Sequence, residues 1–203
     1  MRTFYCTHSS ENTMTSRIFL TVGTTSFDAL VQTVDSAEFL QLAKRCGCRS
    51  LVLQTGRGTF KPQYLSSEEC ERHGVSFECF RFKPNLGEEM AAADLIISHG
   101  GAGSVLEAIS LRKLLLVVVN DTLQDNHQVE IADAMTSRSY CLQTLPGVLL
   151  RTLEHISSRL QGLKESAGDE EEGRLLRALD LQAYPTVDTQ AFPKAVDAMF
   201  SWE

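Results

Sequence analysis

The segment "SHGGAGSVLE", residues 98 to 107, brings glycines together with His99, Ser104 and Glu107. An apolar run that predicts a strand precedes it, and a helical pattern begins near Ala102. Bare glycine backbone lets N–H groups approach a ligand, and the start of a helix presents unsatisfied donors and a positive dipole end. The segment therefore predicts a diphosphate cradle to which His99 and Ser104 add donors. The alternative is a tight strand-to-helix turn capped by Ser104, and the segment alone leaves both open.

Glu107 favours the nucleotide interpretation. It lies one helical turn beyond Gly103, so it projects from the same end of the helix as the glycines. A carboxylate there can accept hydrogen bonds from two ribose hydroxyls, whereas phosphates alone would repel it. The alternative is an acid in the first turn of the helix that interacts favourably with the helix dipole.

Three further loops that follow strand-like runs carry glycine or compact polar residues. They are "VGTTSFD" (22 to 28), "QTGRGT" (54 to 59) and "NDTLQDNHQ" (120 to 128). Ligands bind at the carboxyl ends of the strands in an open parallel sheet, so we expect all four loops to border one crevice. The combination predicts a site shaped for a nucleotide.

A dinucleotide-binding fold is the rival interpretation of the glycines. Asp121 follows Gly101 and Gly103 at about the 20-residue offset of a ribose-binding acid. Two features count against it: Leu106 occupies the third glycine position, and the motif follows the fourth predicted strand rather than the first.

The elements that position these loops follow from hydrophobic periodicity. Continuous apolar runs typical of strands covered on both faces alternate with segments of helical spacing, which predicts an α/β fold with a doubly wound, mostly parallel, Rossmann-like sheet and helices on both faces. We expect strands at 17 to 22, 50 to 55, 75 to 80, 94 to 98, 114 to 119 and, more weakly, 139 to 144, and helical stretches at 27 to 45, 102 to 111, 127 to 135 and 148 to 160.

The chain divides into four parts by composition. A polar N-terminal extension (1 to 16) precedes the Rossmann-like domain (17 to 160), an acidic linker or loop (161 to 173) follows, and a C-terminal helical segment (174 to 203) ends the sequence. In that last part Phe192, Val196, Met199 and Phe200 form one apolar helical face. The face either packs back on its own sheet or docks on a partner.

Composition excludes several classes of function. The net charge of -7 and the lack of a Lys/Arg block argue against a broad nucleic-acid footprint and against direct adhesion to an anionic membrane. The six cysteines lack zinc spacing and fit reduced thiols, and no D-x-D motif ends a strand, so we expect neither a metal nor a cofactor. The longest apolar run, 114 to 119, is far short of the roughly 18 to 20 residues of a membrane span.

The stretch "DLIISHGGAGSVLEAISLRKLLLVVVNDTLQDNHQVEIA" (94 to 132), with "FLTVGTTSFDALV" (19 to 31) and "LVLQTGRGT" (51 to 59), resembles the donor-binding half of the two-Rossmann-domain (GT-B) glycosyltransferases of the family 28 C-terminal-domain type. Within them it is most similar to the cytosolic catalytic subunits of the two-subunit UDP-N-acetylglucosamine transferases of dolichol-linked oligosaccharide synthesis. The similarity runs from about residue 17 to about residue 145.

The resemblance implies a role for each site residue. His99, with the adjoining glycines and Ser104, would meet the UDP phosphates, Glu107 the ribose, and Phe82 would lie where backbone groups contact uracil. His127 and Gln128 would hold the donor sugar, where relatives often carry Asp-Gln or Gln-Gln, so His127 departs from the pattern. The full donor-binding set is Gly23, Thr24, Thr55, Arg57, Phe82, His99, Gly100, Gly101, Gly103, Ser104, Glu107, Asn120, Asp121, Asn126, His127 and Gln128.

Each of three residues in this set has an ordinary structural alternative. Arg57 can be a surface cation, Phe82 a core residue, and His127 simply the start of a helix. No residue is singled out as the catalytic base, and His99 is the residue expected to stabilise the leaving group.

The implied activity is transfer of N-acetylglucosamine, with inversion, from UDP-GlcNAc to GlcNAc-PP-dolichol, the second step of N-glycan precursor assembly. Too little sequence follows residue 145 for a second Rossmann-like domain, so the resemblance implies a heterodimer with a membrane-anchored acceptor-binding subunit that recruits this cytoplasmic chain to the cytosolic face of the endoplasmic reticulum. The C-terminal helix ending near Trp202 is the expected docking element. A non-catalytic nucleotide-sugar-binding or regulatory module and an NAD(P)-binding oxidoreductase remain alternatives.

Overall fold

A computed structural model describes residues 16–120, 127–161 and 173–185. The predicted N-terminal extension up to residue 15, most of the acidic linker and the apolar face from Phe192 to Phe200 lie outside the described residues. Asp121 and Asn126 also lie outside them, and the side chains of His127 and Gln128 are not described.

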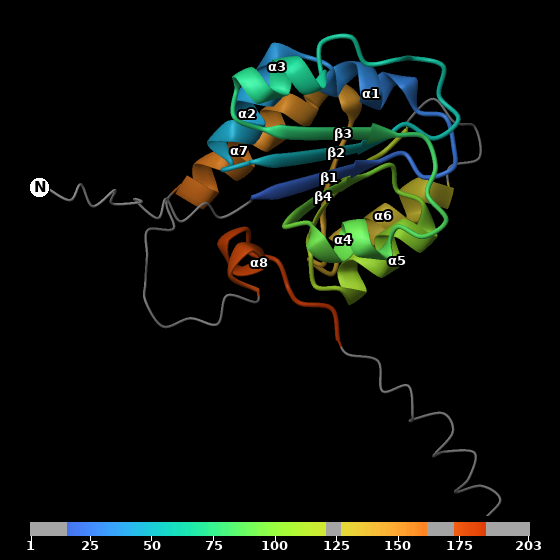
Figure 1. Ribbon diagram of the computed structural model, residues 1–203. Helices are drawn as coiled ribbons and strands as arrows, with labels where there is room; N and C mark the ends of the chain where they lie inside the picture. Colours follow the sequence, from blue (N-terminus) through green and yellow to red (C-terminus); the bar gives the residue numbers. More distant parts are fainter. Residues whose placement is uncertain (1–15, 121–126, 162–172, 186–203) are drawn as a thin grey trace, which may run out of the picture.

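Six parallel strands form one sheet in the order β3-β2-β1-β4-β5-β6 (Figure 1). The chain builds outward from β1 to β3 and then returns to pair β4 with β1, so the direction of winding changes between β1 and β4. The predicted doubly wound α/β class is confirmed, and the carboxyl ends of these two strands are the switch point at which folds of this class bind ligands. The strands are β1 (Arg17–Thr21), β2 (Ser50–Gln54), β3 (Ser76–Phe80), β4 (Leu95–Ser98), β5 (Leu114–Val118) and β6 (Leu142–Thr144).

Helices cover both faces of the sheet (Figure 1). One face carries α1 (Asp28–Val34), α2 (Ala37–Arg45), α3 (Ser67–Arg72) and α7 (Leu149–Gln161), the last entered through a 3₁₀ turn, η1 (Pro146–Val148). The opposite face carries α4 (Gly87–Ala92), α5 (Ala102–Ser110) and α6 (His127–Thr136). The short helix α8 (Arg174–Ala178) packs near α7.

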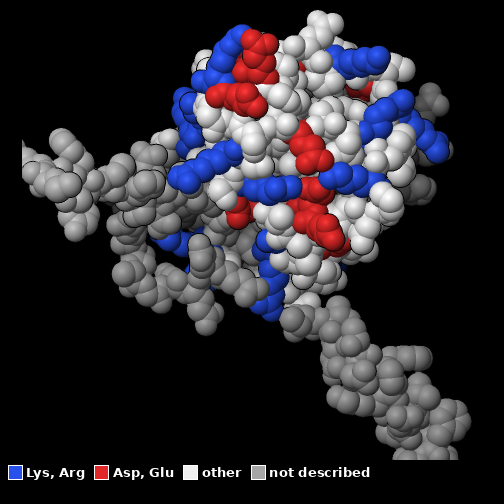
Figure 2. Space-filling view, in the orientation of Figure 1, with Lys and Arg blue, Asp and Glu red and all other residues white. Residues whose placement is uncertain are grey.

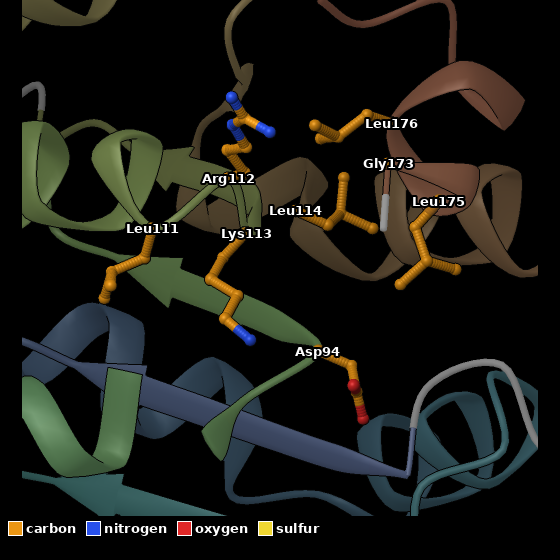
Figure 3. Close-up of a pocket in the computed structure, with 8 residues that line it drawn as sticks. All are labelled: Asp94, Leu111, Arg112, Lys113, Leu114, Gly173, Leu175 and Leu176. Carbon is orange, nitrogen blue, oxygen red and sulfur yellow. The ribbon is translucent and has the colours of Figure 1, made fainter. Parts of the chain in front are cut away.

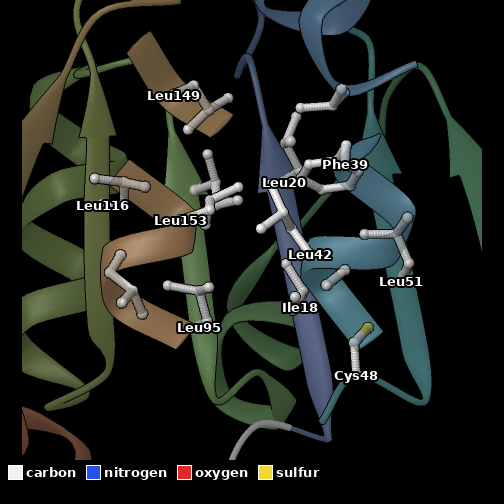
Figure 4. Packing of buried hydrophobic residues seen from close by; sticks show 14 of the residues in the cluster. Ile18, Leu20, Phe39, Leu42, Cys48, Leu51, Leu95, Leu116, Leu149 and Leu153 are labelled. Atoms are coloured by element: carbon white, nitrogen blue, oxygen red, sulfur yellow. The ribbon is translucent and has the colours of Figure 1, made fainter. Parts of the chain in front are cut away.

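The two hydrophobic cores follow from the alternation of side chains along each strand. In β1, Ile18 and Leu20 enter the core beneath α1, α2 and α7, whereas Phe19 enters the core beneath α4 and α5. Figure 4 shows the first core, with Phe39 and Leu42 of α2 and Leu149 and Leu153 at the start of α7 packed over the central strands. This packing fixes the strand ends from which the functional loops emerge.

Two local expectations are wrong. The run 27 to 45 forms two helices: the first ends at Val34, and Ser36 caps the second, its hydroxyl oxygen accepting a hydrogen bond from the Phe39 N–H at 3.2 Å. Strand β3 is not covered on both faces: it lies at the sheet edge, and Ser76, Glu78 and Cys79 are exposed. Helices α3 and α4 were not expected, since each is only six residues long and carries few apolar residues.

The described part of the C-terminal segment packs on the same domain. Leu176, Leu179 and Leu181 are buried in the first core, and the Gln182 N–H donates to the Ser139 carbonyl oxygen at 2.7 Å. Tyr184 makes an edge-on contact with Tyr140, with ring centroids 5.1 Å apart. None of the described helices is both long and apolar enough to cross a membrane.

Candidate nucleotide site at the switch point

The loops after β1 and β4 meet around the ring of His99. This imidazole is only 5% exposed. A Cβ atom at Gly23 would lie 2.5 Å from His99 Cε1, and one at Gly101 would lie 2.5 Å from His99 Nε2. The ring therefore fills the space that side chains would take at both positions, and the two loops approach each other only because both residues are glycine.

Backbone conformation adds a second demand for glycine here. Gly23 has φ +63° and Gly100 has φ +81°, both in the left-handed region. Gly101 has an ordinary extended conformation, so its need for glycine is purely the contact with His99.

The N-terminus of α5 has open donors. Gly101 is the N-cap residue and supplies no side-chain hydrogen bond, and the first turn contains no acid. A Cβ at Gly103 would meet nothing within 4 Å, so this position faces open space. Ser104 lies inside the first turn and is not the cap, so the expectation of a Ser104-capped turn is wrong. The first-turn N–H groups therefore have no capping side chain, and such unsatisfied donors favour binding of an anion.

Two buried polar atoms at the same strand end have no partner among the described residues. They are Ser98 Oγ, on the last residue of β4, and His99 Nδ1. Burial lowers the pKa of the His99 imidazole, which is therefore neutral at physiological pH. A neutral imidazole carries one donor and one acceptor, so it contributes a directed hydrogen bond rather than a positive charge.

Glu107 lies on the exposed side of α5, in its second turn. Its Oε1 atom would be 3.2 Å from a Cβ built on Gly87, the first residue of α4. The carboxylate thus reaches the loop that joins β3 to α4. The alternative interpretation, in which Glu107 is an acid in the first turn of α5 that interacts with the helix dipole, is wrong, because Glu107 lies beyond the first turn. Its carboxylate makes no hydrogen bond with another described residue, which leaves it able to accept from a ligand.

The loop after β2 is joined to the loop after β1. A Cβ at Gly56, where φ is +57°, would lie 2.4 Å from the Thr25 carbonyl oxygen, and that oxygen accepts a hydrogen bond from the Arg57 N–H at 2.8 Å. Thr55 is buried at the end of β2, and its N–H donates to the Phe80 carbonyl oxygen. Arg57 is exposed at this edge. Thr24 is exposed in the loop after β1.

Phe82 is 49% exposed, so the alternative interpretation, that it is a core residue, is wrong. It follows β3, and the Arg81 guanidinium carbon lies 5.7 Å from the centre of its ring. Its exposure leaves the ring and its backbone open to a base. At the end of β5, Asn120 is buried, and the rest of that loop lies outside the described residues.

Thr21 and Gln54 are site residues that the sequence analysis missed. Both are buried at strand ends, and the Thr21 hydroxyl donates to Gln54 Oε1 at 2.5 Å. Thr21 Oγ1 accepts from the Gly23 N–H at 2.9 Å, and Gln54 Nε2 donates to the Arg81 carbonyl oxygen at 3.3 Å. This network links the loops after β1 and β3. A polar residue that ends an otherwise apolar strand was the signal that could have revealed it.

Other features of the described residues are weaker candidates for a functional site than this edge of the sheet. Among the described residues, no group of three or more His, Cys, Asp or Glu side chains is placed to hold a metal ion. A cavity of about 260 Å³ lies at the opposite edge, where Asp94 and Lys113 immediately precede β4 and β5, beside Leu176 of α8 (Figure 3). In the described part of the chain, no two cysteines form a disulfide bond.

Fold and loops together define a class of protein: a Rossmann-like GT-B half-domain in which an uncapped helix N-terminus lies at the switch point. The family model of the glycosyltransferase family 28 C-terminal domain matches residues 17–176, and the chain belongs to this family.

Two relatives and one solved structure illustrate the similarity. The UDP-N-acetylglucosamine transferase subunit ALG13 of Homo sapiens is 41% identical over 136 residues, which are 64% of this chain and 12% of that protein. The protein of the same name from Yarrowia lipolytica is 32% identical over 160 residues, 79% of this chain and 80% of that protein. The NMR solution structure of ALG13 is 28% identical with a TM-score of 0.51 and covers 73% of this chain and 87% of that chain. This chain thus spans a small part of the human relative and most of the yeast one.

Proposed function

We propose that this chain binds UDP-GlcNAc and transfers its sugar, with inversion, to GlcNAc-PP-dolichol as the catalytic subunit of a heterodimer. Membership of glycosyltransferase family 28 supports the sugar-transfer class. The human and Yarrowia relatives are named as UDP-N-acetylglucosamine transferase subunits, which supports the choice of donor and the need for a second subunit.

One observation carries the proposal. No side chain caps the N-terminus of α5, the space beside Gly103 is open, and Glu107 lies one helical turn beyond Gly103. The first-turn amides suit the diphosphate and the carboxylate suits the ribose hydroxyls. Phe82, exposed in the loop that Glu107 approaches, suits the base. The nucleotide would run from the switch point across the α4 and α5 side of the sheet.

The reaction on this site is a single displacement. The acceptor hydroxyl gives its proton to a general base, to which no residue is assigned, and attacks the anomeric carbon; the bond from that carbon to the UDP oxygen breaks, and the electron pair leaves with UDP. Negative charge grows on the β-phosphate, where the first-turn amides of α5 and the Ser104 hydroxyl donate to it. His99, held neutral by burial, fixes the loops of Gly23 and Gly101 around that phosphate and adds one directed hydrogen bond.

The acceptor is assigned to the partner. In this proposal a membrane-anchored acceptor-binding subunit presents the lipid-linked sugar at the cytosolic face of the endoplasmic reticulum, and the C-terminal segment from residue 186 docks on it. The described residues 173–185, which pack on the domain, would position that segment.

The test is a transfer assay. The chain, purified alone or with membranes that contain a candidate partner, is given UDP-GlcNAc and a GlcNAc-PP-lipid acceptor. We expect disaccharide-lipid product only with the partner. Binding of UDP-GlcNAc without transfer in any partner's presence would favour a non-catalytic nucleotide-sugar-binding module instead. Binding of NAD in place of UDP-GlcNAc would favour the oxidoreductase.

A further inference from the structure

A second cavity opens at the ends of β2 and β3, beside the switch point. Its volume is about 490 Å³, which lies in the range of small-molecule sites. Phe60 and Pro62 give it an apolar wall, Phe80 borders it at the end of β3, and Arg57, Lys61 and Arg81 bring three cations to it. Such a lining suits a ligand with both an apolar body and a negative charge.

The wall of this cavity is built by a loop that is fixed in place. Residues 55 to 66 form no helix or strand, and loops of about this length are uncommon unless they serve a function. Asp28 Oδ2 accepts hydrogen bonds from the Thr59 N–H at 3.1 Å and the Thr59 hydroxyl at 2.7 Å. Asp35 accepts from the N–H groups of residues 63 to 65 at 2.7 to 2.9 Å. Carboxylates at both ends of α1 therefore hold the loop before any ligand arrives.

The three cations are unusual in their surroundings. The chain carries a net charge of -7, yet in the part that the structure describes no carboxylate pairs with Arg57, Lys61 or Arg81. Arg81 is oriented by a hydrogen bond from its Nε to the Gly56 carbonyl oxygen at 3.1 Å. Figure 2 shows Lys and Arg side chains at the right-hand edge, near the loop after β2, whereas elsewhere on this face the two signs alternate. Three cations without a carboxylate partner around one cavity favour the binding of an anionic ligand there.

The cavity shares Thr55 and Arg57 with the predicted donor-binding set, but it extends from them away from α5. Its loop is attached to α1 on one side of the sheet, whereas Glu107 and the N-terminus of α5 belong to the opposite side. It begins at Thr55 on β2, one strand away from β1, and neighbouring strands are about 4.8 Å apart. Two ligands could occupy the adjoining sites together, as a sugar transfer requires.

We infer that this cavity binds the diphosphate of a prenyl-type lipid, with its first apolar carbons against Phe60 and Pro62. The inference rests on the proposed function, in which such a lipid carries the acceptor sugar. The inference adds that this chain binds the acceptor lipid directly, together with its partner.

The experiment is a calorimetric titration of the full chain with farnesyl diphosphate, with and without saturating UDP-GlcNAc. Farnesol and inorganic pyrophosphate are the matched probes that lack the charge or the apolar chain. We expect farnesyl diphosphate to bind equally with and without UDP-GlcNAc, and both probes to bind at least about tenfold more weakly. Lys61→Gln should weaken farnesyl diphosphate about tenfold, while Lys44→Gln, on the exposed last turn of α2, should not.

Several results would overturn the inference. Absence of binding, equal binding of farnesol, or equal binding of pyrophosphate would each contradict a site for an apolar diphosphate. Displacement of farnesyl diphosphate by UDP-GlcNAc, with no effect of Lys61→Gln, would place the anion in the donor site instead. Farnesyl diphosphate binding is read separately from UDP-GlcNAc binding, so this inference and the proposed function can fail independently.

Discussion

At the scale of single residues, Gly101 and Gly103 serve different purposes although they are two positions apart. Gly101 leaves room for the buried ring of His99, while Gly103 faces open space. A sequence shows only that both are glycine, because the partner of Gly101 comes from the fold. The composition of the loop predicted an anion site, but it could not predict that the His99 ring fills the space next to Gly101.

Substitution separates the two glycines. Gly101→Ala should lower the free energy of unfolding by about 1 to 3 kcal/mol, because the added methyl group meets a buried imidazole that cannot move freely. Gly103→Ala should leave it unchanged or raise it by about 0.5 kcal/mol, because alanine is the better helix residue and nothing obstructs it. Urea unfolding of the two variants measures both. Equal stability of the two would show that His99 does not constrain Gly101.

His99 should also make stability depend on pH. Its pKa in the folded protein is lowered from 6.5 by burial, so below about pH 6.5 the unfolded chain takes up a proton that the native chain resists. The contribution of neutral His99 to the free energy of unfolding is therefore complete above about pH 6.5 and is lost as the pH falls below it. Unfolding free energies at about pH 7.5 and pH 5.5 should differ less in His99→Gln than in the unsubstituted chain. His155→Gln, at an exposed position of α7, is the control, and an unchanged pH dependence in His99→Gln would refute the assignment.

At the scale of elements, the strands could be predicted from the sequence, whereas the break between helices α1 and α2 could not. The apolar runs predicted six strands within one or two residues, except that the weak sixth begins three residues later, at Leu142. The break at Ser36 was missed because apolar spacing continues across it, and only the capping hydrogen bond ends one helix and starts the next. The exposure of β3 was missed because an edge position is a property of strand order, which no single run of residues records.

The loop after β2 provides a test at this scale. Asp35→Asn should lower the free energy of unfolding by about 1 to 3 kcal/mol, because a neutral amide accepts the three backbone hydrogen bonds less strongly. The loosened loop should also be cut faster by trypsin after the exposed Arg57. Glu38→Gln, an exposed acid in the first turn of α2, is the matched control. Identical cleavage rates in the two variants would show that Asp35 does not hold the loop.

At the scale of the whole molecule, parallel pairing carries the loops after β1, β2, β3, β4 and β5 to one edge of the sheet. This is why residues far apart in the sequence could be predicted to share a site. The change of winding between β1 and β4 brings Gly23 and His99 together there. The Thr21 and Gln54 network escaped prediction, because it depends on which strands are neighbours and on side-chain geometry.

The central claim is that the N-terminal half of α5 binds the nucleotide of a UDP-sugar, and Glu107 tests it most directly. Calorimetric titration of UDP-GlcNAc should show at least about tenfold weaker binding for Glu107→Gln, since the charged acceptor for the ribose hydroxyls is lost. Glu88→Gln, at an exposed acid in the first turn of α4, should bind as the unsubstituted chain does. The exposure of Glu107 means that stability should be little changed. Equal affinity of Glu107→Gln and the unsubstituted chain would contradict the account.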